Sequence, residues 1–247
     1  MKRKKARLIV ALDVETSEEA LSLVDSLSSE VDIFKVGSQL FTACGPQVVR
    51  SILAKGKKVF LDLKFYDIPH TVACSTSTAT VISQPLNKGL TEGYSHVFML
   101  TLHARGKEML AAAAQAASDK ARELNVERPL LVGVTVLTSE TKSDSMQDTV
   151  LKRARCAKES GLDGVVASAQ EASMIRREMG DDFIIVTPGI RPKGAEVGDQ
   201  KRITTPQEAI QNGSDFLVVG RPIIRAKDPQ QAAQQILKEM EDAIQSL

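Results

Sequence analysis

Short apolar runs alternate with helical patterns along the whole chain. The runs are nearly continuous, as expected for strands buried on both faces of a parallel sheet. We expect eight strands, at Leu8–Leu12, Ile33–Val36, Lys58–Leu63, His96–Leu102, Leu130–Leu137, Gly164–Ala167, Ile184–Val186 and Phe216–Val219. Helices are predicted between them, and a last amphipathic helix from about Pro229 to the C-terminus. Its apolar positions repeat every four residues, at Ala232, Ile236, Met240 and Ile244.

Eight successive strand–helix units predict an α/β fold, a (β/α)₈ TIM barrel. An open doubly wound sheet is the alternative. The count of eight, and the lack of a GxGxxG motif after the first strand, favour the barrel. With no linker, we expect a single barrel domain over residues 1–247, in which residues 1–6 form a basic, solvated tail. The stretch Ser83–Ser95 contains Pro85, Gly89 and Gly93 and indicates a loop.

Composition narrows the function classes. The formal net charge of the 247 residues is +1, which gives no reason to expect nucleic-acid binding. The chain has no long apolar segment and no signal peptide, so we expect no membrane contact and a cytoplasmic location. The cysteines, Cys44, Cys74 and Cys156, are too far apart for a zinc motif. Cys44 and Cys74 fall in helical segments, where we expect them to be buried.

The third predicted strand ends in a cluster of charges. Asp62, Lys64 and Asp67 follow Val59 within a few residues, and Asp62 and Lys64 share one face of the strand. Two carboxylates can keep a lysine protonated and aim it at a reacting carbon. This cluster is therefore the strongest candidate for catalytic chemistry.

Other strands also end in polar residues. The first ends in Asp13, the second in Lys35, the fourth in His103, and the fifth in Thr135 and Thr138. Active sites of barrels form at the C-terminal ends of the strands. Charges at that end of three consecutive strands would therefore face one mouth.

The last two strand connections predict an anion site. Barrels often hold phosphate with the loops after strands seven and eight. Gly220 lets an anion approach backbone N–H groups, and Arg221 can bind it bidentately. Arg191 and the polar run 198–202 lie in the preceding loop, whose glycines and prolines favour a segment that closes over a ligand. The residues alone thus predict a barrel enzyme that acts on a small phosphorylated substrate.

At these positions the chain resembles the orotidine 5′-phosphate decarboxylase family, over essentially its whole length. Eight motifs match in order: Ala11-Leu12-Asp13, Phe34-Lys35-Val36-Gly37, Asp62-Leu63-Lys64-Phe65-Tyr66-Asp67-Ile68-Pro69, Gly133-Val134-Thr135-Val136-Leu137-Thr138-Ser139, Ser168-Ala169-Gln170-Glu171-Ala172, Thr187-Pro188-Gly189-Ile190-Arg191-Pro192, Asp199-Gln200-Lys201-Arg202 and Val219-Gly220-Arg221-Pro222.

The resemblance implies decarboxylation of orotidine 5′-monophosphate to uridine 5′-monophosphate and CO₂, without cofactor or metal, at the end of de novo pyrimidine biosynthesis. It makes Lys64 the donor of a proton to C6 and places Asp62 beside the substrate carboxylate. It implies a homodimer, in which Asp67 comes from the second subunit to join a network with Lys35. The remaining substrate-binding residues would be Asp13 and Lys35 at the ribose, Thr138 at the pyrimidine, Ile68 and Thr71 across the interface, Pro188, and Arg191, Gln200, Gly220 and Arg221 at the phosphate.

The chain departs from the family pattern after the fourth strand. The run Thr101–Lys107 stands where an Asn-Val-His-Ala-X-Gly-Gly run is expected, so a threonine replaces the asparagine and Lys107 replaces the second glycine. This run holds none of the family's catalytic positions, so we expect the activity to be unaffected and His103 to be structural. His70 replaces a polar amide, and residues 83–95 lengthen the interval before the fourth strand.

Two alternatives stay open. A magnesium-dependent sugar-phosphate decarboxylase or aldolase shares the Asp-X-Lys-X-X-Asp run but has an acidic residue where this chain has Lys35, which would repel a divalent cation. A non-catalytic phosphate-sensing barrel would need Arg191 and Arg221 but would have no reason to keep the charges of the third strand.

Overall fold

The computed structural model describes residues 6–82, 96–137, 146–192 and 204–246. The strands in these residues are β1 (Arg7–Ala11), β2 (Ile33–Gly37), β3 (Lys58–Phe65), β4 (Met99–His103), β5 (Leu130–Val134), β6 (Gly164–Val166), β7 (Ile184–Thr187) and β8 (Phe216–Val219). The helices are α1 (Ser17–Ser26), α2 (Ser38–Ala54), α3 (Pro69–Thr80), α4 (Lys107–Leu124), α5 (Met146–Glu159), α6 (Ala169–Met179), α7 (Pro206–Gln211), α8 (Arg221–Ile224) and α9 (Pro229–Gln245).

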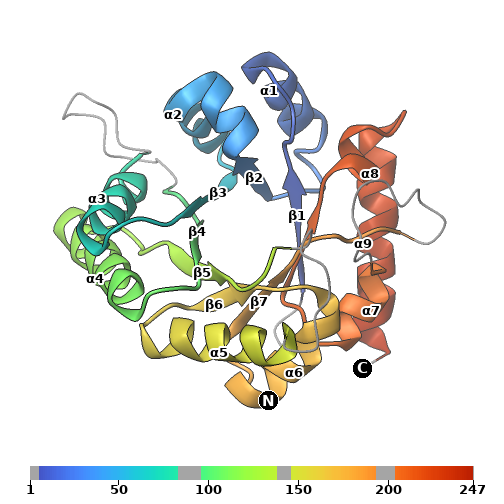
Figure 1. The fold of residues 1–247 in the computed structure, drawn as a ribbon. Helices are drawn as coiled ribbons and strands as arrows, with labels where there is room; N and C mark the ends of the chain where they lie inside the picture. Colours follow the sequence, from blue (N-terminus) through green and yellow to red (C-terminus); the bar gives the residue numbers. More distant parts are fainter. Residues whose placement is uncertain (1–5, 83–95, 138–145, 193–203, 247) are drawn as a thin grey trace.

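The eight strands form a closed parallel barrel in sequence order, with the helices around its outside (Figure 1). Closure is made by β1, in which Ile9 pairs with Ile33 of β2 on one side and with Val218 of β8 on the other. The predicted barrel fold is thus confirmed, and the open doubly wound sheet is excluded.

The alternation of side chains along the strands divides the apolar residues into two cores. One core fills the space between the strands and the helices. The other fills the barrel interior, with Ile9, Ile33, Phe60 and Met99 among its residues. Because side chains on one face of a strand recur every second residue, the next inward positions above this layer lie toward the mouth of the barrel.

Several predicted strand ends were displaced. The fifth strand was expected to reach Leu137 but ends at Val134. The apolar residues Val136 and Leu137 line a cavity instead of continuing the sheet, which explains why they resembled strand residues. Conversely, β3 extends beyond the predicted Leu63 to Phe65, and β4 begins later than predicted, at Met99.

Two expectations about the helices need correction. In α9, Ile236 and Met240 are buried as predicted, but Ala233 and Ala243 are buried in place of the half-buried Ala232 and Ile244. Cys74 is exposed, because α3 buries a face made of Val72, Thr76, Ala79 and Thr80. Cys44 is partly buried.

Two salt bridges join neighbouring strands at the N-terminal end of the barrel. Asp163, just before β6, accepts hydrogen bonds from Arg128 Nη1 and from the backbone N–H of Leu131, both at 2.7 Å. Asp215, just before β8, accepts hydrogen bonds from Arg176 Nη2 at 2.6 Å and from the N–H of Ile185 at 2.8 Å. Each carboxylate therefore satisfies a backbone donor of a strand as well as a guanidinium.

The chain enters the barrel earlier than the predicted tail allows. Ala6, the last residue of that tail, is buried against the core, whereas residues 1–5 lie outside the described part. In the described ranges, no helix combines the length and the apolar character needed to cross a membrane.

Candidate active site

The strand register brings the predicted charges together at the C-terminal mouth of the barrel. Lys35 lies two residues after the inward-facing Ile33, and Asp62 lies two residues after the inward-facing Phe60. Both side chains consequently point into the mouth, directly above the apolar layer of the interior.

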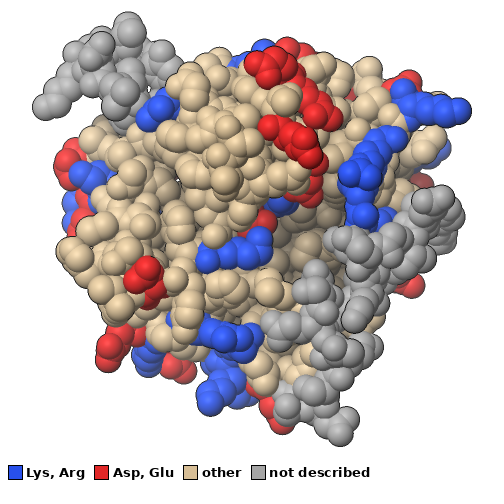
Figure 2. All heavy atoms as spheres, turned by 45° about the horizontal axis from the view of Figure 1, so that its top comes forward, with Lys and Arg blue, Asp and Glu red and all other residues tan. Residues whose placement is uncertain are grey.

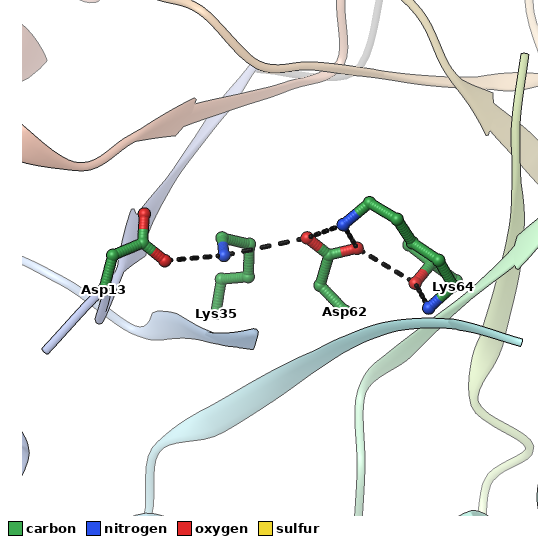
Figure 3. Close-up of polar contacts among 5 residues, drawn as sticks. Asp13, Lys35, Asp62 and Lys64 are labelled. Atoms are coloured by element: carbon green, nitrogen blue, oxygen red, sulfur yellow. Dashed lines mark hydrogen bonds and ion pairs between the residues drawn. The ribbon is translucent and has the colours of Figure 1, made fainter. Parts of the chain in front are cut away.

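Four charged side chains form a continuous line across this mouth (Figure 3). Lys35 Nζ lies 3.0 Å from Asp13 Oδ1 and 3.6 Å from Asp62 Oδ2. Lys64 Nζ donates to both oxygens of Asp62, each at 2.9 Å. The order Asp13, Lys35, Asp62, Lys64 alternates in sign, so each charge is next to an opposite one.

Asp62 is the most buried member of this line, with 9% of its surface exposed. Burial by itself raises the pKa of this carboxyl, but the charges of Lys35 and Lys64, together with hydrogen bonds from Lys64 and Thr101, outweigh burial and hold the pKa below its usual value. Asp62 therefore stays ionised near neutral pH and keeps a negative charge beside the ammonium of Lys64.

Gly37 provides the room that Lys35 needs. A Cβ at this position would lie 2.9 Å from Lys35 Nζ and 3.7 Å from Asp13 Oδ1. Any side chain there would push the ammonium away from the carboxylates, which gives the glycine of the predicted Phe34–Gly37 motif a physical reason.

Two cavities meet at the charged line. The first, of about 140 Å³, is mainly apolar and is bordered by Lys35, Asp62 and Lys64 together with Phe60, Val134, Val136, Leu137, Val166, Ala167, Pro188 and Val218. The second, of about 410 Å³, is polar and is bordered by Asp13, Lys35, Arg191, Gly220 and Arg221 among others. Lys35, Pro188 and Val218 border both cavities, so the two are neighbours. Figure 2 shows charged side chains in and beside the hollow of this face.

The second cavity has the features of an anion site. The Arg191 side chain is buried, with its Nη1 donating to the carbonyl of Ile190 at 2.9 Å. Arg221 begins α8 directly after Gly220. A Cβ on Gly220 would lie 3.4 Å from Asp13 Oδ2. The lack of a side chain at Gly220 therefore lets the backbone at the start of α8 lie close to Asp13. The geometry thus brings together Arg191, Gly220 and Arg221, three of the residues that were predicted to hold phosphate.

Sequence reasoning missed three residues of this site. Gln39 and Arg225 also border the second cavity. Arg225 follows Arg221 by four residues, a helical spacing that could have indicated it. Thr101 is buried and its hydroxyl donates to Asp62 Oδ1 at 2.9 Å. The Thr101–Lys107 run thus contributes a direct hydrogen bond to Asp62, a contact that the sequence did not reveal.

Other predicted site residues are not gathered at the charged line. Asp67 is exposed, and its Oδ1 accepts the N–H of Ile68 at 2.6 Å. Ile68 is 64% exposed and Thr71 is also exposed. Thr138, Gln200 and the predicted closing segment, residues 193–203, lie outside the described residues, as do residues 83–95.

The remaining departures from the family pattern have local contacts. The ring of His103 packs edge-on against Tyr66, with the ring centroids 5.6 Å apart. Lys107 forms a 3.0 Å ion pair with Glu159, which raises the pKa of this lysine. His70 Nε2 lies 3.7 Å from Cys74 Sγ on the surface of α3.

A comparison with known families covers nearly the whole barrel. Residues 6–236 match the protein-family model described as Orotidine 5′-phosphate decarboxylase / HUMPS family. The chain belongs to this family. The sequence resemblance was therefore correct, and it extends over both cavities and all the strands.

Named relatives agree with this membership. The orotidine 5′-phosphate decarboxylase of Syntrophotalea carbinolica is 48% identical, over 97% of this chain and 96% of the relative. That of Syntrophomonas wolfei is 45% identical, over 96% of this chain and 98% of the relative. The crystal structure of the Lactobacillus acidophilus orotidine 5′-phosphate decarboxylase has a TM-score of 0.78 and 34% identity, and the match covers 95% of this chain and 99% of that one.

Proposed function

We propose that this protein is an orotidine 5′-phosphate decarboxylase that converts orotidine 5′-monophosphate to uridine 5′-monophosphate and CO₂. This reaction is the last step of de novo pyrimidine biosynthesis. The observation that carries the proposal is the position of Lys64, whose ammonium is bound to both oxygens of Asp62 and borders the apolar cavity. Near-full-length identity to named decarboxylases supports the same reaction.

The two cavities fit the two halves of this substrate. The apolar cavity suits a flat pyrimidine ring, with Lys64 and Asp62 at its polar edge. The polar cavity suits the ribose and the phosphate, with Asp13 and Lys35 near the sugar hydroxyls. Arg191 and Arg221 supply the positive charge, and Gly220 allows the phosphate to approach the backbone. Pro188 borders both cavities and would lie beside the glycosidic bond.

The chemistry follows from the charged line. The bond between C6 and the carboxylate breaks, CO₂ leaves, and the electron pair stays on C6, where the ring offers no position to delocalise it. The ammonium of Lys64 stabilises this carbanion electrostatically and then donates a proton to C6. The Asp62 carboxylate holds the Lys64 ammonium in place before the reaction, and solvent returns the proton to Lys64 afterwards. The protein's own groups suffice for these steps, so we propose no cofactor and no metal.

A second copy of the chain would complete the site. The adjoining residues Tyr66, Asp67 and Ile68 are all exposed, and Tyr66 and Ile68 are 59% and 64% exposed, respectively. Large apolar side chains exposed side by side favour a protein contact. We propose a homodimer in which Asp67, Ile68 and Thr71 of one protomer reach the site of its partner. Thr138 and Gln200 are proposed as ligands of the pyrimidine and of the phosphate, respectively.

The magnesium-dependent alternative is disfavoured by Lys35. Its ammonium lies between Asp13 and Asp62, at 3.0 and 3.6 Å from their oxygens, so a cation already occupies the place where these carboxylates could share a metal. A group of three or more His, Cys, Asp or Glu side chains suited to a metal does not occur within residues 6–82, 96–137, 146–192 and 204–246. The three unpaired cysteines support a reducing, cytoplasmic location.

The decisive experiment is the loss of orotidine monophosphate absorbance after addition of purified, EDTA-treated protein. We expect rapid loss without added metal. No loss, together with activity on a sugar phosphate that magnesium restores, would assign the protein to the alternative reaction. Binding of uridine monophosphate without turnover of either substrate would favour a phosphate-sensing barrel.

A further inference from the structure

The pairing of β3 with β4 is interrupted beside the reactive lysine. Leu61 pairs with Leu100, but the next pair is Phe65 with Leu102. Three residues of β3 therefore stand opposite a single residue of β4, Thr101. Such a bulge leaves backbone groups without their regular ladder partners.

Lys64 lies at the end of this bulge in an uncommon backbone conformation. Its φ is +53°, in the left-handed region that residues with a side chain seldom adopt. This conformation turns the strand so that the Lys64 ammonium returns to the carboxylate of Asp62 only two residues earlier. The surroundings must hold the conformation in place, because the isolated chain disfavours it.

The hydroxyl of Thr101 fills the gap that the bulge creates. Thr101 is 1% exposed, and its Oγ1 accepts the backbone N–H of Lys64 at 2.8 Å. The same hydroxyl donates its one proton to Asp62 Oδ1 at 2.9 Å. A hydroxyl has one donor and two acceptor sites, so these two bonds have a fixed direction. One side chain thus joins the backbone of the lysine to the carboxylate that binds its ammonium.

We propose that Thr101 is a positioning residue for the decarboxylation, acting through Lys64 and Asp62. Its hydroxyl fixes the left-handed backbone of Lys64 and the rotation of the Asp62 carboxylate, and thereby the direction in which the ammonium points. This inference rests on the proposed function, and it adds to that function a residue outside both cavity walls.

The groups around Asp62 determine what loss of this hydroxyl would change. Lys35 faces Asp62 from β2 and Lys64 from β3, with Asp13 beyond Lys35. From β4 come the neutral Thr101 and, at the strand end, His103, whose ring contacts Tyr66. Removing the Thr101 donor takes away one interaction that favours the ionised carboxylate, so the pKa of Asp62 rises.

The test compares Thr101→Val, Thr101→Ser and a matched control, Thr80→Val. Thr80 is 1% exposed, like Thr101, but it lies at the end of α3, where its hydroxyl donates to the backbone carbonyl of Thr76 at 2.9 Å. For Thr101→Val we expect kcat to fall roughly 10- to 100-fold, with the Kd for uridine monophosphate changed less than about 3-fold. The acid limb of the kcat profile should move to higher pH. Thr101→Ser should recover most of kcat, and Thr80→Val should leave kcat and the acid limb unchanged.

An NMR titration of the Asp62 carboxyl separates this inference from the proposed function. With ¹³C-labelled aspartate, the Asp62 pKa should rise in Thr101→Val and not in Thr80→Val, whether or not the protein turns over orotidine monophosphate. Lack of turnover by the wild type would refute the function alone. Wild-type kcat and an unmoved Asp62 titration in Thr101→Val would make Thr101 purely structural and overturn the inference. Should Thr101→Val not fold, Thr101→Ala carries the same comparison.

Discussion

Carboxylates paired with cations occur at both ends of the barrel, but the two ends differ in which other groups bind those carboxylates. At the N-terminal end, Asp163 and Asp215 each bind a guanidinium and also a backbone N–H of a neighbouring strand. At the C-terminal end, Asp62 binds Lys35 and Lys64 across a mouth that opens into two cavities. A carboxylate tied to the backbone stabilises the fold, whereas one tied to lysines beside a cavity remains available for chemistry.

The largest effect should come from removing the ammonium of Lys64. Lys64→Ala should lower kcat by more than about 1,000-fold, because both the electrostatic stabilisation of the carbanion and the proton donor are lost. Steady-state assays give kcat, and thermal unfolding should show a fold that is retained.

The control for this variant lies on the same strand. Lys58 begins β3 at the opposite end of the barrel, where its ammonium lies 5.4 Å from the ring centroid of Phe98. Lys58→Ala should leave kcat unchanged. Substantial turnover by Lys64→Ala would remove Lys64 as the acid.

The converse experiment removes a carboxylate at the N-terminal end of the barrel. Asp215→Ala removes the partner of Arg176, and both side chains are largely buried, with 17% and 11% exposed, respectively. We expect the free energy of unfolding to fall by about 3 kcal/mol, because a buried guanidinium loses its counter-charge. Urea unfolding measures this loss, and kcat of the folded protein should stay at the wild-type value. A lower kcat with unchanged stability would contradict the view that the N-terminal carboxylates stabilise the fold while the C-terminal ones serve catalysis.

Arg221 should affect binding of the phosphate and not of the nucleoside. Arg221→Ala should weaken binding of uridine monophosphate roughly 10- to 100-fold, the usual loss for a hydrogen bond between charged groups, and change uridine binding less than about 3-fold. Inhibition constants of the two ligands, measured for wild type and variant, give the ratio of the two losses in affinity. Arg225→Ala, an exposed arginine on the same cavity wall, should give a smaller ratio. Equal weakening of both ligands would argue against a phosphate site at Arg221.

The smallest expected effect concerns acid stability. The pKa of Asp62 is lowered in the folded state, so its contribution to stability is present above the pKa of the unfolded chain, about 4, and is lost as pH falls through the folded value. Asp62→Asn lacks this contribution. The difference in unfolding free energy between wild type and Asp62→Asn should therefore be constant near neutral pH and shrink below about pH 4. Urea unfolding at several pH values tests this, and a difference that grows on acidification would contradict it.

The barrel could be predicted because its strands are buried on both faces, which leaves eight clear apolar runs. Strand ends were predicted less well, because the apolar residues Val136 and Leu137 line a cavity and do not continue the sheet. The charges of Asp13, Lys35, Asp62 and Lys64 were predicted to share one mouth, and they do. Thr101 was missed because its proposed role depends on an irregular pairing of β3 with β4, which cannot be recognised from the sequence of either strand. The role of Asp67 depends on a second protomer and stays a prediction.

The irregular pairing of β3 also has a consequence for redesign of this enzyme. Regular pairing resumes at Phe65 and Leu102, so Lys64 is anchored to the sheet on both sides of the irregularity. The walls of the apolar cavity come largely from other elements, with Val134 on β5 and Val166 on β6. An engineer could therefore reshape those walls to admit a different ring while leaving Lys64, the proposed proton donor, where it is.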